Sequence, residues 1–128
     1  MEGEITVPNE TTAAAAYGIS IDAEILQEIV RRIVAVANPE RIILFGSAAR
    51  TQMNRNSDVD LLIVKSEPFD YARLVGDIYV NLHGVGQAVD VVLVTPEQAE
   101  RYRNTHYLVI APALRDGIEV YHATVPSG

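Results

Sequence analysis

The sequence predicts one α/β domain, and three observations support this fold class. Segments with the spacing of amphipathic helices alternate with short apolar runs of strand length, as in layered folds of sheets and helices. The chain has 128 residues, the usual size of a single domain. Its residues are 48% hydrophobic, which is enough for a core, and the absence of cysteine excludes disulfides and thiolate metal sites.

The two ends of the chain lack the patterns of regular structure. Residues 1–18 show no sustained periodicity, and Pro8, a threonine-rich stretch and Gly18 are typical of an arm. We therefore expect a flexible arm over residues 1–18, the domain over 19–122 and a tail over 123–128.

Helices and strands are expected in alternation along the domain. A first helix begins near Ser20, carries apolar pairs every four residues opposite charged ones, and ends at Asn38-Pro39. Gly84 is expected to cap the second helix, and Thr95-Pro96-Glu97 to begin the third. The strands are expected at 42–45, 59–64, 89–94 and 118–121, and the later helices at 70–83, from 96 onward and at 107–115. The run over 59–64 is apolar on both faces after its start, which predicts a central strand.

The negative net charge of the chain disfavours some classes of binding partner. Seventeen acidic and ten basic residues give a formal net charge of −7, the wrong sign for stable binding of nucleic acid. Glu2 and Glu4 lie where a secretory signal needs positive charge, and no apolar run has the length of a membrane span. We expect a soluble cytoplasmic protein without a membrane or nucleic-acid partner.

The segment most indicative of chemistry is Gly46-Ser47, followed after ten residues by Asp58-Val59-Asp60. A strand that ends in Gly-Ser and turns into a helix offers a hydroxyl and unpaired backbone N–H groups, which favour phosphate. Asp58 and Asp60 are two apart on a strand, so both carboxylates point to one face. This pair can hold divalent cations, and Mg²⁺ is the expected ion because it takes oxygen ligands together with substrate phosphates.

A third carboxylate, Asp90, lies within the apolar run of residues 88–94. Burying a carboxylate there is costly unless it is paired, hydrogen-bonded or bound to a metal. Three acids at the starts of adjacent strands would build a two-metal site that clamps the attacking and leaving oxygens of an in-line displacement. The pattern suggests phosphoryl or nucleotidyl transfer.

These residues carry a resemblance to a known family. The run FGSAARTQMNRNSDVDLLIV over residues 45–64 resembles the signature of the polymerase-beta-like nucleotidyltransferase superfamily, in particular its minimal nucleotidyltransferases. The chain departs from many relatives at Ala48 and Thr51, and the likeness covers roughly residues 20–121. It implies a nucleotidyltransferase fold, with a small mixed sheet packed against helices. The agreement lies in Gly46, Ser47, Arg50, Ser57, Asp58 and Asp60.

The resemblance also implies roles for these positions. The nucleotide would be bound by Gly46, Ser47 and Arg50, with the Ser47 hydroxyl at the terminal phosphates. Two Mg²⁺ ions would be held by Asp58, Asp60 and Asp90, and Asp90 would help to deprotonate the acceptor hydroxyl.

A function follows from the same resemblance. A Mg²⁺-dependent enzyme would move AMP from ATP to a hydroxyl acceptor. Because few residues follow the third strand, we expect another chain to complete the acceptor site. In the family this partner is a HEPN ribonuclease toxin modified on a tyrosine, which makes the minimal nucleotidyltransferase an antitoxin. Two alternatives stay open: a non-catalytic antitoxin that masks its partner, and an aminoglycoside-type nucleotidyltransferase acting on a small molecule as a homo-oligomer.

Other local patterns have simpler explanations. Gly84-Val85-Gly86 follows a helix and lacks the third glycine of a dinucleotide-binding fingerprint, so it predicts a turn. Arg101 and His106 have the spacing used by HEPN ribonucleases, but those domains are all-helical and the match is an accident. Core or interface positions are expected for Tyr71, Tyr79 and Tyr107, which lie on helix faces.

Overall fold

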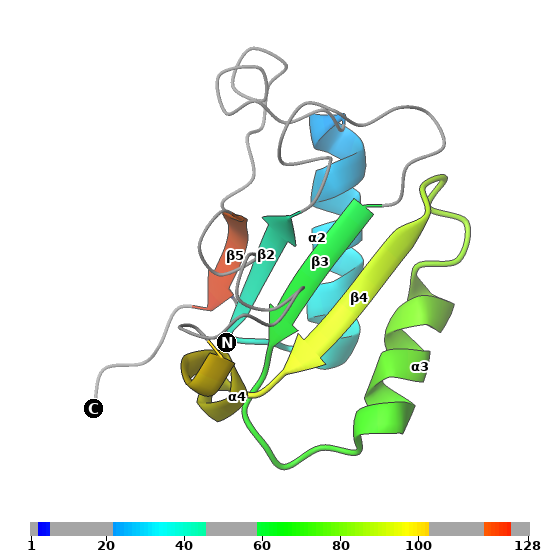
Figure 1. The fold of residues 1–128 in the computed structure, drawn as a ribbon. Coiled ribbons are helices and arrows are strands. Elements are labelled where there is room, and N and C mark those ends of the chain that lie inside the picture. The colour runs from blue at the N-terminus through cyan, green and yellow to red at the C-terminus, as the bar shows by residue number, and fades with distance from the viewer. Residues whose placement is uncertain (1–2, 6–21, 46–58, 103–116, 124–128) are drawn as a thin grey trace.

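The computed structural model describes residues 3–5, 22–45, 59–102 and 117–123, and these form a mixed sheet with three helices (Figure 1). The sheet has five strands in the order β1-β5-β2-β3-β4. Only β3 and β4 are parallel, while the other neighbouring pairs are antiparallel. The strands are β1 (Gly3–Ile5), β2 (Arg41–Phe45), β3 (Val59–Val64), β4 (Val89–Val94) and β5 (Ile118–Ala123). The predicted α/β class and the mixed sheet are confirmed.

The helices divide between the two faces of this sheet. Helix α2 (Ala23–Ala37) and helix α3 (Tyr71–Asn81) contribute buried residues to one core cluster, so we call their side the α2 face. Helix α4 (Pro96–Tyr102) packs through Ala99 against Leu62 and Val94 on the opposite side, which we call the α4 face. In Figure 1, α2 lies behind the sheet and α3 lies beside the edge strand β4.

Helix α2 begins and ends where its sequence supplies caps. The Asp22 carboxylate accepts hydrogen bonds from the backbone N–H groups of Glu24, at 2.7 Å, and Ile25, at 3.3 Å. Asn38 takes a left-handed conformation (φ 47°) and is followed by Pro39, which cannot continue the hydrogen-bonding pattern. The predicted helix is confirmed, and its start shifts from Ser20 to the residue after this cap.

The two shorter helices also follow local signals. Asp70 caps α3 by accepting from the Arg73 N–H at 3.1 Å. Thr95 and Gln98 form a reciprocal capping box at the start of α4, with distances of 2.9 and 3.1 Å, and Pro96 is its first residue as predicted. The prediction that Gly84 caps α3 is wrong. Leu82 is the cap, and Gly84 (φ 83°) instead supplies a left-handed residue in the following turn.

The core lies on both sides of β3, as the prediction of a central strand requires. Val59, Leu61 and Ile63 pack on the α2 face. Leu62 and Val64 pack on the α4 face. Because successive side chains of a strand alternate between faces, a strand that is buried on both sides must be apolar almost throughout. Asp60 is the exception within β3, and this makes its position informative.

A short strand lies near the N-terminus, where the sequence predicts no regular element. The pattern predicts no element within residues 1–18, whereas Gly3–Ile5 forms an edge strand paired with β5. Three residues are too few for an alternating pattern to be detected. The predicted helix at 107–115 lies outside the described residues, and the boundaries at 19 and 122 stay predictions. Within the described ranges, no helix is long and apolar enough to cross a membrane.

Candidate active site

Two of the predicted carboxylates lie next to each other in the sheet. Asp60 in β3 and Asp90 in β4 are directly paired in the parallel register. Asp60 lies two residues before Leu62, and Asp90 two residues before Val92. Residues two apart on a strand share a face, and Leu62 and Val92 pack on the α4 face, so both aspartates belong to that face. The structure thus brings Asp60 and Asp90 together at the amino-terminal ends of neighbouring strands.

The two carboxylates differ in burial. Asp60 is half-buried in a central strand, whereas Asp90 is exposed. The sequence pattern suggests a buried Asp90, and this is wrong because β4 is an edge strand whose first four residues are only partly covered. Exposure removes the desolvation cost that a buried carboxylate would carry, so the position of Asp90 is not costly for a carboxylate side chain.

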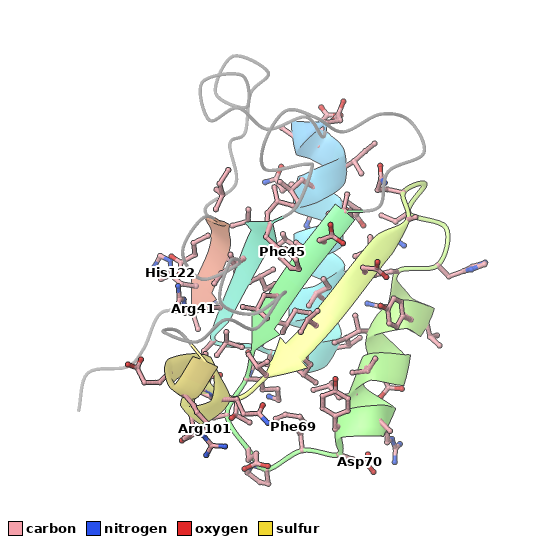
Figure 2. All side chains as sticks on the ribbon, viewed as in Figure 1. Arg41, Phe45, Phe69, Asp70, Arg101 and His122 are labelled. Carbon is pink, nitrogen blue, oxygen red and sulfur yellow. The ribbon has the colours of Figure 1, made fainter. Side chains whose placement is uncertain are left out.

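The C-terminal end of β2 lies beside Asp60. Phe45, the last residue of β2, is paired with Asp60 across the antiparallel ladder. It packs beside the cluster on the α4 face, and Figure 2 shows it on that side of the sheet. The chain therefore leaves β2 beside Asp60 and returns into β3 at Val59. The predicted site residues between these points, and so outside the described ranges, are Gly46, Ser47, Arg50 and Asp58.

Comparison with known proteins assigns this arrangement to a family. The family model for a nucleotidyltransferase domain matches residues 23–114, which is most of the chain. The chain belongs to this family. Its nucleotidyltransferase domain includes both aspartates and the whole segment that joins β2 to β3. Domains of this family generally use a nucleotide substrate and a divalent metal ion.

Solved structures support the fold of this nucleotidyltransferase domain. The crystal structure of a candidate nucleotidyltransferase from Sulfolobus solfataricus superposes with a TM-score of 0.51 and 19% sequence identity. The match covers 75% of this chain and 76% of the other. At this identity the likeness establishes a shared fold. No curated protein matches the chain.

The donor set at the paired strands fits the metal chemistry of the family. Mg²⁺ prefers carboxylate oxygens, keeps several waters and needs access to substrate phosphates. A half-buried and an exposed aspartate on one face satisfy these demands better than a closed cage would. Among the residues that the structure describes, no group of three or more Asp, Glu, His or Cys side chains forms a metal site. The predicted third ligand, Asp58, lies outside them.

Two basic side chains of the described part of the sheet, Arg41 and His122, lie at the other end of β2. The Arg41 Nε lies 2.7 Å from Glu119 Oε2, and His122 Nδ1 lies 3.5 Å from Glu119 Oε1. Figure 2 shows Arg41 and His122 together, apart from Phe45. These side chains are more than one-third exposed, so the pairs contribute little stability. We assign them to the pairing of β2 with β5.

The structure also reveals a contact next to Asp90 that sequence reasoning missed. The hydroxyl of Tyr79 in α3 accepts a hydrogen bond from the backbone N–H of Val91 at 2.9 Å. Tyr71 and Tyr79 are 56% and 41% exposed, so of the expected core or interface positions the core is wrong for both and the interface stays a prediction, and Tyr107 lies outside the described residues. Helical spacing indicates on which face of a helix a tyrosine lies, but it does not identify the hydrogen-bond partner of the tyrosine hydroxyl.

Proposed function

We propose that this nucleotidyltransferase domain moves AMP from ATP to a hydroxyl group, in a reaction that depends on Mg²⁺. The observation that carries the proposal is the register pairing of Asp60 with Asp90 on the α4 face. Two carboxylates at one end of neighbouring strands, beside the exit of the chain from β2, can share divalent ions with a triphosphate. When bound, such ions neutralise phosphate charge and lower the pKa of a coordinated hydroxyl.

In the proposed transfer, one bond to phosphorus forms and another breaks. The acceptor oxygen forms a bond to the α-phosphorus of ATP. The bond from that phosphorus to the oxygen bridging to the β-phosphorus breaks, and pyrophosphate leaves with the electron pair. The acceptor proton passes to a base, for which we propose the exposed Asp90 carboxylate. Asp60 is less exposed and serves to hold the reacting groups in place.

For the acceptor, we propose a tyrosine of a HEPN-type ribonuclease toxin, which this chain would silence as its antitoxin. Two features support the proposal. The motif over residues 45–64 resembles that of the minimal nucleotidyltransferases, whose partners are such toxins. The net charge of −7 favours association with a basic protein, because complementary charges speed encounter and suppress wrong partners.

A mass measurement tests this function. The purified chain is incubated with ATP, Mg²⁺ and the HEPN protein encoded beside it, and the intact mass of that protein is recorded. We expect an increase of one AMP per modified tyrosine. Asp60→Asn keeps the volume of the side chain but removes its charge, and should reduce the transfer rate by at least about a hundredfold. Asp77→Asn, which alters an exposed carboxylate on α3, is the matched control and should transfer normally.

The other outcomes separate the alternatives. An unmodified partner with wild-type protein contradicts protein adenylylation. If the Asp60→Asn variant still neutralises the toxin, the chain acts by binding alone. ATP-dependent inactivation of an aminoglycoside, with no change in the partner, would instead favour a small-molecule enzyme.

A further inference from the structure

We propose that Tyr79 is a positioning residue that holds the backbone next to Asp90. The inference rests on the proposed function, because it gives Tyr79 a role in setting the candidate site. Its basis is the 2.9 Å hydrogen bond from the Val91 N–H to the Tyr79 hydroxyl. The same peptide unit contains the carbonyl group of Asp90, so this bond restrains the backbone that carries the carboxylate.

The strand arrangement explains why such a restraint matters. β4 is the last strand of the sheet, and its neighbour in the described ranges is β3 alone. The Val59 N–H donates to the Ala88 carbonyl and the Lys65 N–H donates to the Val94 carbonyl, both at 2.9 Å. In a parallel ladder with this register, even-numbered residues of β4 direct their N–H and C=O groups to β3, and odd-numbered residues direct theirs outward. Val91 therefore points its N–H away from the sheet, where the Tyr79 hydroxyl accepts it.

Helix α3 is itself fixed close to Tyr79. The Asn81 amide nitrogen donates to the Arg32 carbonyl at 2.9 Å. The Arg32 guanidinium donates to the carbonyls of Asn81, at 3.4 Å, and His83, at 3.1 Å. These contacts join the C-terminal end of α3 to α2, two residues beyond Tyr79. The hydroxyl is thus presented to β4 from an anchored helix, with Ile78 buried in the core next to it.

The backbones of the two aspartates are held in different ways. Asp60 is in a central strand and is constrained by neighbours on both sides. Asp90 is exposed in the edge strand, and the Tyr79 bond provides a second constraint on its backbone. Partners that orient ligating groups are commonly needed for metal affinity, even though they do not touch the metal. Tyr79 would act in this way on Asp90, and it would make no contact with substrate.

The test compares Tyr79→Phe with Tyr71→Phe. Both substitutions remove one hydroxyl from an exposed tyrosine of α3 and keep the ring, but no described residue is hydrogen-bonded to the Tyr71 hydroxyl. In Tyr79→Phe, amide hydrogen exchange measured by NMR should be about fivefold faster at Val91, as expected for the loss of one ordinary hydrogen bond. In Tyr71→Phe, exchange at Val91 should be unchanged.

A titration with Mn²⁺ then measures the effect on the site without turnover. Paramagnetic broadening of the Asp60 and Asp90 amide signals reports ion binding residue by residue. We expect the Mn²⁺ concentration at half-maximal broadening to rise about tenfold in Tyr79→Phe. It should stay at the wild-type value in Tyr71→Phe, which should also keep the thermal unfolding midpoint of the wild type, whereas the midpoint of Tyr79→Phe should fall slightly with the loss of one hydrogen bond. A merely structural role of Tyr79 would lower the midpoint in the same way but leave the Mn²⁺ titration unchanged.

Three results would overturn the inference: wild-type exchange at Val91 in Tyr79→Phe, faster exchange with an unchanged Mn²⁺ titration, or an equal shift in both variants. Failure of the proposed function is recognised separately. A wild-type protein that binds Mn²⁺ at Asp60 and Asp90 but transfers no nucleotide contradicts that function, while the titration still decides the role of Tyr79.

Discussion

At the scale of single residues, Asp60 and Asp90 share a register position but differ in their surroundings. The half-buried Asp60 interrupts an otherwise buried strand, so its carboxylate occupies a place where an apolar side chain would pack. Asp90 is exposed and displaces no packing. Substitutions at the two positions should therefore differ in their effect on stability, even if both remove activity.

The exposed position of Asp90 allows a sharp prediction. Asp90→Asn removes the charge and the proposed base, so nucleotide transfer should fall by about a hundredfold or more. The free energy of unfolding should change by no more than about 0.5 kcal/mol, because surface substitutions away from packing have small effects. Pyrophosphate release and urea denaturation measure the two quantities. An active variant, or an inactive one that is also strongly destabilised, would contradict this assignment.

At the scale of elements, helix α2 carries an ion-pair network that titrates. The Glu28 carboxylate accepts a hydrogen bond from Arg32 Nε at 2.9 Å and also contacts Arg31. The hydrogen bond from Arg32, with the charges of both arginines, lowers the pKa of Glu28 below its ordinary value. Because Arg32 also binds the carbonyls at the end of α3, the network connects the two helices.

This lowered pKa predicts a pH-dependent effect on stability. A carboxyl group with a depressed pKa in the folded state stabilises the fold above its unfolded pKa, and this contribution is lost as the pH falls through the folded value. Glu28→Gln should therefore have a lower unfolding midpoint than the wild type at neutral pH. The difference should vanish in acid, below the lowered pKa of Glu28.

Thermal unfolding followed by circular dichroism, from neutral pH down to a pH below the lowered pKa of Glu28, tests the effect. The Asp77→Asn variant is the control, because the described residues give Asp77 no ion pair, and it should show no comparable trend. A Glu28→Gln difference that persists at low pH would mean that the side chain acts by packing rather than by charge.

The elements show what the sequence could predict. The bounds of β3 and β4 follow directly from apolar runs, and α4 begins at Pro96 as its local sequence predicts, whereas α2 begins after Asp22 rather than near Ser20. β1 is too short to show a period, and the end of α3 at Leu82 rather than Gly84 depends on backbone hydrogen bonds that composition does not specify.

At the scale of the whole molecule, strand order decides which predicted site residues meet. The spacing of Asp60 and Asp90 along the chain does not reveal that they are paired, because this requires β3 and β4 to be parallel neighbours. Nor could the pattern show that β4 lies at the edge, which exposes Asp90 and leaves a backbone N–H for Tyr79. The motif predicts the chemistry of the site, while the topology determines its geometry.

The central claim is that Asp60 and Asp90 together hold divalent metal and nucleotide. The most direct measurement is a crystal structure of the chain with Mn²⁺ and a non-hydrolysable ATP analogue, with the metal located by its anomalous scattering. We predict a Mn²⁺ ion coordinated by carboxylate oxygens of both aspartates and by phosphate oxygens of the analogue. Metal and triphosphate bound elsewhere, with neither aspartate among the ligands, would contradict the claim.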